Sequence, residues 1–372
     1  MDTASIQTLN DADRDAIGAA GGLLTIDLNA IRANYRTMRD KLSPATHCGC
    51  VVKADGYGMG ASRIATMLAA EGCRWFFVAH LAEAIALHAV LPADAKVVVL
   101  HGPTPGAEPS FADHGIIPVL NSPEQVAAWR TLAAARGKTL PALLQFDTGM
   151  SRFGLPENEP LDLTGIDVLV VMSHLACADT PEHPANASQL AAFRRIVRRF
   201  PGIPASLSAT SGIFLGPDYH FDIVRAGAGL YGVNPQSGSP NPLHPVVRLQ
   251  GLVMQVRMVP EGTAVGYGHT RITTRPTRLA TVAVGYADGF LRSTGPQGAA
   301  YIHDTKLPVM GRVSMDSIIF DATDAEVHVG DLVDLIGTHH DLDAAATAAG
   351  TIGYELLTTS LGARYARRYI GG

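Results

Sequence analysis

Short apolar runs alternate with amphipathic stretches from about residue 23 to residue 234. Apolar runs of this length, bounded by turn residues, predict buried strands, and the stretches before or between them have the spacing of helices. The expected strands are Cys48–Lys53, Trp75–Ala79, Lys96–Leu100, Ile117–Leu120, Leu143–Asp147, Val168–His174, Ala205–Ala209 and Ile223–Gly227. The expected helices are Leu28–Leu42, Ser62–Ala70, Leu81–Val90, Pro123–Arg136 and Ala187–Phe200.

Buried strands that alternate with helices predict a parallel sheet, and eight strands predict a closed (β/α)8 barrel of the TIM type. An open, doubly wound sheet has the same pattern and remains the alternative.

One helix start is well marked: Ser122 is the expected N-cap before Pro123, and Gln125 is placed to close a capping box.

The pattern changes after about Ser239. Strands dominate from there, separated by Gly, Pro and Asp, and the one helical stretch is Asp341–Ala348. The expected strands are Val246–Val259, Thr277–Val284, Lys306–Met310, Ser317–Phe320 and Leu332–Ile336. The predicted organisation is therefore a flexible N-terminal tail over residues 1–22, an α/β barrel over 23–239 and a mostly β domain over 240–372.

Composition narrows the class of protein. The length of 372 residues favours two domains, and 47% hydrophobic with 17% charged residues is typical of a globular chain. The net charge of −5 argues against a nucleic-acid surface, and no apolar run reaches membrane-spanning length. The first 22 residues lack the features of a secretory signal, and the four cysteines are sparse and fit no metal spacing, so we expect a cytoplasmic protein without a metal site.

Reactive side chains follow five of the expected barrel strands. Active sites of such barrels form at the carboxyl ends of the strands. A single such side chain has an ordinary structural interpretation; a lysine at a strand end, for example, is usually a solvated charge. Five reactive segments at equivalent strand ends predict an active site. The segments are Val51-Val-Lys53-Ala-Asp-Gly-Tyr57-Gly, Asp147-Thr-Gly-Met-Ser-Arg152, Ser173-His174, Thr210-Ser211-Gly and Arg225-Ala-Gly227-Ala228-Gly.

The chemistry of these segments is coherent. A desolvated lysine beside other cations has a lowered pKa and can form a Schiff base with an aldehyde. The small residues after Arg225 let backbone N–H groups approach a phosphate, and Ser211 and Tyr57 add hydroxyl donors. Together they predict pyridoxal phosphate as cofactor. A sugar-phosphate aldolase with a Schiff-base lysine shares these features and stays open at this point.

The Lys53 segment resembles the cofactor-lysine motif of the alanine racemase family, and the resemblance covers about residues 23–369. It continues in order through the four other barrel segments and into the β domain. The further motifs are Leu230-Tyr-Gly, Gly266-Tyr267-Gly, Gly285-Tyr286-Ala-Asp-Gly, Gly311-Arg-Val-Ser-Met315-Asp and Gly353-Tyr354-Glu. The resemblance implies a pyridoxal-phosphate enzyme that interconverts L-alanine and D-alanine and supplies D-alanine for the cell wall.

The resemblance also implies a role for each matched residue. Lys53 would be the base on the D face of the substrate and Tyr267 the base on the L face. His174 and Arg225 would bind the cofactor and supply the environment that lowers the pKa of Tyr267, and Arg225 would also face the pyridine nitrogen. The remaining roles are phosphate binding by Tyr57, Ser211, Gly227, Ala228 and Tyr354, and substrate contact or entry at Arg152, Met315 and Tyr286.

Tyr267 and Met315 would reach the barrel of a second subunit, so the resemblance implies a homodimer with shared sites. The chain departs from the family at Gln145, where many members carry a carbamylated lysine that orients the arginine matching Arg152, and at Thr210, where asparagine is frequent. The alternatives are a serine or broad-specificity amino-acid racemase and, in another class, a non-catalytic pyridoxal-phosphate-binding protein.

Overall fold

The computed structural model describes residues 7, 9–361 and 364–371. The chain divides into two compact units, one formed by residues 31–244 and the other by residues 1–30 together with 245–372.

The unit of residues 31–244 is a parallel barrel. Its strands follow the order β8-β7-β6-β5-β4-β3-β2-β9, all parallel where they pair. The bounds are β2 His47–Val51, β3 Trp75–Val78, β4 Lys96–Val99, β5 Ile117–Leu120, β6 Leu140–Gln145, β7 Ile166–Met172, β8 Ala205–Ser206 and β9 Ile223–Ala226. The two ends of the order meet: Arg225 N–H donates to Ser208 O at 2.9 Å, and a parallel bridge joins Ala209 to Arg225. The closed barrel is therefore confirmed, and the open sheet is excluded.

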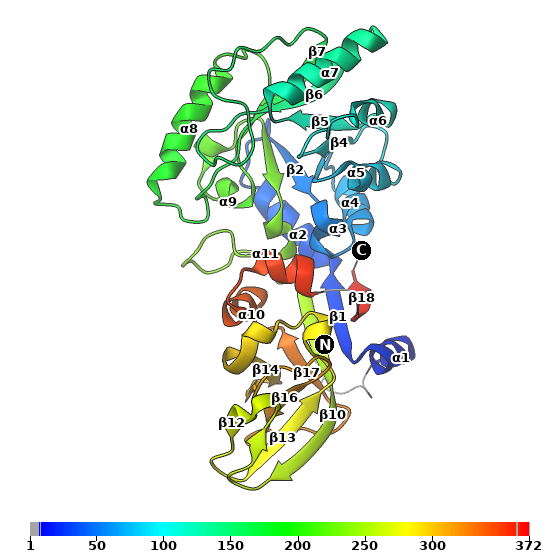
Figure 1. The fold of residues 1–372 in the computed structure, drawn as a ribbon, viewed down its shortest axis with the longest axis vertical. Coiled ribbons are helices and arrows are strands. Elements are labelled where there is room, and N and C mark those ends of the chain that lie inside the picture. Colours follow the sequence, from blue (N-terminus) through cyan, green and yellow to red (C-terminus); the bar gives the residue numbers. More distant parts are fainter. Residues whose placement is uncertain (1–6, 8, 362–363, 372) are drawn as a thin grey trace. The chain divides into compact units, whose positions relative to one another are not determined.

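Helices connect the barrel strands, and α7 and α8 lie outside the strands in Figure 1. The expected helices are present as α2 Leu28–Arg39, α4 Ala61–Ala70, α5 Leu81–His88, α7 Pro123–Arg136 and α8 Pro184–Val197. The pattern missed the short helices α6 Glu108–Asp113 and α9 Thr210–Ile213, and it missed α3 Lys53–Tyr57, a single turn whose inner residues have left-handed backbone angles. These span less than two helical turns each, which is too little for a periodic signal.

Ser122 caps α7 as expected, since its hydroxyl accepts the Gln125 N–H at 3.3 Å. The expected capping box is wrong, because the Gln125 side chain accepts from Asn121 N–H at 2.7 Å. The same amide donates to His101 O at 3.0 Å, so the neighbouring loop holds it away from Ser122.

The other unit is built on a mostly antiparallel sheet in the order β15-β14-β17-β10-β1-β18, with β13 and β16 extending from β10. Its strands have largely apolar, buried faces that form the core of the unit. The longer strands are β1 Gly22–Asp27, β10 Val247–Val259, β13 Thr277–Val282, β14 Ala299–Ile302, β15 Thr305–Pro308, β16 Ile318–Asp321, β17 Leu332–Ile336 and β18 Ala366–Ile370, and the longer helices are α1 Asp11–Ala20 and α10 Leu342–Ala349.

The N-terminal segment differs from the expectation of a tail followed by the barrel. Strand β1 pairs antiparallel with β10 and parallel with β18, so it belongs to the β sheet and the barrel unit begins at residue 31. Helix α1 is ordered by its Asn10 cap, by the fully buried Ile17 and by a 3.0 Å ion pair between Asp13 and Arg368. The rest of the expected tail, residues 1–6 and 8, lies outside the described residues.

Within the described residues, no helix combines the length and apolar character that crossing a bilayer requires.

Candidate active site

Lys53 lies directly after β2, at the carboxyl end of the barrel, on a turn of unusual backbone. Ala54, Asp55, Gly56 and Tyr57 all have positive φ, between 53° and 62°. A run of left-handed residues returns the chain sharply, so that Lys53 and Tyr57 both lie at the barrel end. Burial lowers the pKa of Lys53 from its usual value, and the Arg152 cation lowers it further against the opposing charge of Glu83.

Arg225 and His174 form the second part of the site. Arg225 is 2% exposed on β9 and donates to Ser173 O at 2.8 Å, to the Ser206 hydroxyl at 2.6 Å and to His174 Nδ1 at 3.2 Å. Among the described residues, its hydrogen-bond partners are all neutral. Burial lowers the pKa of Arg225 to about 10, which keeps it charged at neutral pH. Burial and then the charge of Arg225 lower the pKa of His174 to about 3, so its imidazole is neutral.

A cradle of small residues follows Arg225. The Ala228 N–H has no hydrogen-bond partner within the part of the chain that the structure describes. A Cβ at Gly227 would lie 3.0 Å from the Tyr57 hydroxyl oxygen, so the absence of a side chain lets that hydroxyl approach the cradle. Tyr57 is held there by stacking on Tyr231 at 4.6 Å between ring centroids.

Thr210 sets the shape of this cradle. Its hydroxyl oxygen accepts the N–H of Gly227 at 2.9 Å and the N–H of Gly229 at 3.2 Å, and the side chain is 3% exposed. The Gly227 N–H is thus directed at Thr210, and the N–H left for an anion is that of Ala228. Ser211 follows at the start of α9, at the same end of the barrel.

Arg152 stands exposed after β6, near enough to lower the pKa values of Lys53 and His174. The turn before it is organised by Asp147, whose carboxylate accepts the N–H groups of Gly149 and Met150 at 2.8 and 2.9 Å. Burial acts to raise the pKa of Asp147, but these backbone donors outweigh it and the pKa is lowered. Among the described residues, no hydrogen bond joins Gln145 to Arg152.

The remaining predicted residues belong to the β unit. Tyr267 is 69% exposed in the hairpin between β11 Ala264–Val265 and β12 Arg271–Ile272. Met315 is 53% exposed, and its carbonyl accepts the Ala287 N–H at 2.9 Å, which places it beside the half-exposed Tyr286. Tyr354 is exposed in the short α11 Gly353–Glu355.

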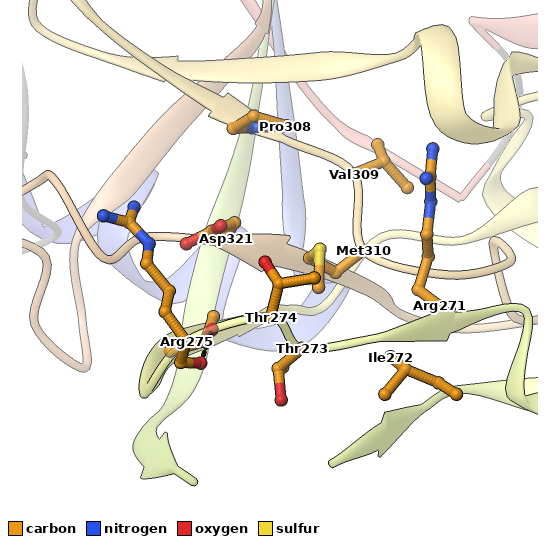
Figure 2. A pocket seen from close by; sticks show the side chains of 10 residues that line it. Arg271, Ile272, Thr273, Thr274, Arg275, Pro308, Val309, Met310 and Asp321 are labelled. Atoms are coloured by element: carbon orange, nitrogen blue, oxygen red, sulfur yellow. Dashed lines mark hydrogen bonds between the residues drawn. The ribbon is translucent and has the colours of Figure 1, made fainter. Parts of the chain in front are cut away.

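The β unit contains a hollow of about 320 Å³. Figure 2 shows the side chains that line it, and none of the predicted site residues is among them. Arg271 and Arg275 border it, and Arg275 pairs with Asp324 at 2.6 Å. Thr273 is committed to Pro260 O at 2.8 Å. We assign no chemistry to this hollow.

Three residues of the barrel site escaped the sequence reasoning. Glu83 on α5 accepts from the backbone at the ends of β2 and β3, and His101 after β4 packs against the His80 ring at 4.6 Å. Gln189 is 2% exposed on α8 and bonds two segments, at Thr148 and at His174 and Ala176. The signal for Gln189 was available, because it falls on the apolar face of its helix beside Leu190 and Phe193.

No group of three or more His, Cys, Asp or Glu side chains that could hold a metal ion exists among the described residues.

Comparison with known proteins connects this geometry to a family. Residues 26–235 match the family model described as alanine racemase, N-terminal domain, and residues 246–369 match alanine racemase, C-terminal domain. The catabolic alanine racemase of Mesorhizobium japonicum is 50% identical over 95% of this chain and 94% of its own length. The alanine racemase of Rhodospirillum rubrum is 47% identical over 95% of this chain and 96% of its own.

Solved structures agree. The alanine racemase of Bartonella henselae, with covalently bound pyridoxal phosphate, is 44% identical with a TM-score of 0.90, covering 94% of this chain and all of that one (100%). The alanine racemase of Streptomyces coelicolor is 31% identical with a TM-score of 0.88, covering 97% of this chain and 100% of that one. Both family domains, in this order and over nearly the whole length, show that the chain belongs to the alanine racemase family.

Proposed function

We propose that this chain is a pyridoxal-phosphate-dependent isomerase that interconverts L-alanine and D-alanine. The observation that carries the proposal is the position of Lys53, a lysine with a lowered pKa at the carboxyl end of the barrel, the same end that carries the cradle of small residues at Gly227 and Ala228. Membership of the family and the 50% identity to a named alanine racemase support the same reaction.

The residues at the barrel end support the proposal of this cofactor. Lys53 supplies the amine that would hold it covalently. The unpaired Ala228 N–H, the Tyr57 hydroxyl and Ser211 would bind the phosphate, with Gly227 giving the space and Tyr354 adding a hydroxyl. Arg225 would face the pyridine nitrogen and, as a lasting cation, keep it unprotonated. When bound, the cofactor supplies the electron sink that makes the α-proton of an amino acid removable.

The protein's own residues then move the proton and hold the substrate. A lysine with a lowered pKa is neutral more readily near pH 7, so Lys53 can act as the base on the D face. Tyr267 would serve the L face. Arg152 and the Met315 N–H would hold the substrate carboxylate, and Tyr286 would line the entry. His174 stays neutral and bonded to Arg225, which suits a spacer beside the ring better than a proton carrier.

The functional unit we propose is a homodimer with two shared sites. Tyr267 and Met315 are two large apolar or aromatic side chains left 69% and 53% exposed in the β unit, as expected of groups that a second copy covers. A lone subunit would then lack the L-face base.

The proposal also covers the preferred substrate and the physiological role. Alanine is the first substrate and serine the second, with a broad-specificity racemase as the weaker alternative. We propose that the enzyme is cytoplasmic and supplies D-alanine for cell-wall synthesis. The relatives in Mesorhizobium japonicum and Agrobacterium fabrum carry the word catabolic in their names, so breakdown of D-alanine is a second candidate role. Growth of a deletion strain without D-alanine would argue against the first role.

The test of activity is a racemisation assay with alanine, serine, lysine and arginine in both directions, using wild type and Tyr267→Phe. We expect turnover of alanine by wild type and its near loss in the variant with the cofactor still bound. No turnover of any substrate would sink the proposal, whereas bound cofactor without turnover would favour the non-catalytic carrier. An unimpaired Tyr267→Phe would remove Tyr267 from its role.

A further inference from the structure

The turn that carries Lys53 is strained. Four successive residues, Ala54, Asp55, Gly56 and Tyr57, have φ of 53°, 54°, 62° and 55°. L-residues other than Gly rarely adopt this conformation even singly, so their surroundings must hold it. The strained residues directly follow Lys53, the residue that would bind the cofactor, so the contacts that maintain their conformation matter for the site.

Several contacts inside the turn help to hold it. The Gly56 N–H donates to Val52 O at 2.8 Å, and the Gly58 N–H donates to Ala54 O at 2.7 Å. Asp55 accepts the Ala61 N–H at 2.8 Å and thereby fixes the far side of the turn. These contacts leave the first peptide of the turn, directly after Lys53, to be held from outside.

Glu83 provides that external contact. One carboxylate oxygen accepts the Ala54 N–H at 2.6 Å, and the other accepts the N–H groups of Ala79 and His80 at 2.8 and 2.9 Å. Ala79 and His80 follow β3, so a single side chain joins the ends of two neighbouring barrel strands. Charge-assisted hydrogen bonds of this kind are stronger than bonds between neutral groups.

Glu83 also opposes the positive charge at the barrel end. In the described part of the chain, Arg152, His101 and His174 also interact with the charge of Lys53, and His80 packs on His101. Arg152 is a cation, and the three histidines are bases. Burial lowers the pKa of Lys53, and Glu83 acts in the opposite direction. The same carboxylate that holds the turn therefore lies within electrostatic range of the lysine amine.

We propose that Glu83 is a positioning residue for Lys53, which locks the strained turn to the end of β3 and balances the charge of the lysine. The functional meaning rests on the proposed role of Lys53 as the cofactor lysine. The mechanical part concerns this chain whatever its substrate, because the hydrogen bonds do not involve a ligand.

The experiment compares cofactor-free wild type with Glu83→Gln and with Asp55→Asn. The asparagine variant removes an equal charge from the turn itself but keeps the oxygen that accepts the Ala61 N–H. Each protein is treated with trinitrobenzenesulfonate over a range of pH, and Lys53 modification is followed by peptide mass mapping, with the exposed Lys138 as internal reference. We expect the midpoint for Lys53 to move to lower pH in Glu83→Gln and to stay in place in Asp55→Asn.

A second readout tests the mechanical part. Binding of pyridoxal phosphate, followed by its visible absorption, should weaken in Glu83→Gln by about tenfold, the order expected for one lost charge-assisted hydrogen bond. Adding Ala54→Gly to that variant relieves the strain of the first left-handed residue, so binding should recover while the pH midpoint stays low.

An unchanged midpoint and unchanged binding in Glu83→Gln would overturn the proposal, as would equal midpoint shifts in both single variants. Glutamine keeps the shape of Glu83 and one acceptor oxygen. Circular dichroism checks the fold of every variant. If the Glu83→Gln protein unfolds and Ala54→Gly restores it, the result supports the locking role. Failure of the proposed function is separate, since it would appear as wild type without racemisation while Lys53 still titrates.

Discussion

Arg225 donates a hydrogen bond from Nη2 to Nδ1 of His174 at 3.2 Å. A guanidinium has no acceptor, so Nδ1 accepts and the imidazole proton must lie on Nε2. Burial is the largest of the causes that lower the pKa of His174 to about 3. The Arg225 cation lowers it further, because a second proton on Nδ1 would face that buried charge. His174 is therefore a neutral imidazole and Arg225 a cation, and neither titrates at physiological pH.

This pair makes stability pH-dependent in a defined window. The folded pKa of His174 is about 3, below the ordinary value of about 6.5, so the unfolded chain takes up the proton first as pH falls. Stability is complete above about pH 6.5 and decreases down to about pH 3. Between pH 7 and pH 5.5 we expect His174 to account for about 1 kcal/mol of lost unfolding free energy.

Urea unfolding of the cofactor-free protein at these two pH values checks the expectation, with His174→Gln as comparison. The glutamine variant should be less stable at pH 7 but should lose less on acidification. An equal loss in both proteins would show that other groups cause the pH dependence.

Arg225→Lys keeps the charge but should destabilise the protein. Arg225 donates to Ser173 O, Leu207 O, the Ser206 hydroxyl and His174 from one planar fork, whereas an ammonium group has three donors and a different geometry. Loss of two buried hydrogen bonds predicts a decrease of about 3 kcal/mol in unfolding free energy. The matched control is Arg198→Lys, which changes an exposed arginine on the end of α8 and should leave the urea midpoint unchanged.

The barrel was predictable because its strands are buried on both sides. Each appears as an apolar run such as Trp75–Val78 or Ile117–Leu120, and the reactive side chains that follow five of the expected strands mark the functional end. Strand β1 was not among the expected strands, and its residues were assigned to the barrel, because its partners β10 and β18 lie more than 220 and 340 residues further along the chain by their register. Nothing local distinguishes such a strand from a barrel strand.

The site was predictable to the extent that it lies on motifs. Lys53, Arg152, His174 and Arg225 stand in segments of distinctive composition. Glu83 acts through backbone N–H groups of other segments, so its role depends on the fold and on the left-handed turn after Lys53. No spacing along the chain reports that contact.

Gln189→Leu should loosen the loops that carry Arg152 and His174. Its amide accepts the Ala176 N–H at 2.8 Å and donates to His174 O at 3.0 Å and to the Thr148 hydroxyl at 3.2 Å. Leucine fits the volume but leaves the Ala176 N–H and the His174 carbonyl without this partner, whereas the Thr148 hydroxyl keeps its hydrogen bond to the Ser173 hydroxyl. We therefore expect a loss of about 2 kcal/mol in unfolding free energy. Ser188→Ala on the exposed side of the same helix is the control, and a urea midpoint that does not differ between the two variants would contradict the prediction.

Thr210→Val should weaken cofactor binding more than it affects the barrel. The valine keeps the methyl contact with Gly229, where an added Cβ would lie 2.6 Å from the Thr210 methyl carbon, but removes the oxygen that accepts two N–H groups. The N–H groups of Gly227 and Gly229 would then turn toward water or the phosphate, which distorts the cradle. We expect a stability loss of about 2 kcal/mol and a clear decrease in affinity for pyridoxal phosphate.

Thr210→Ser isolates the hydroxyl, because it keeps the acceptor and removes only the methyl group. It should bind the cofactor nearly as wild type does, while Thr210→Asn tests whether the residue frequent elsewhere in the family can supply the same acceptor with a longer side chain. Equilibrium binding of the cofactor and urea unfolding are measured on all three. If valine and serine bind the cofactor equally well, the hydrogen bonds from Gly227 and Gly229 do not shape the cradle.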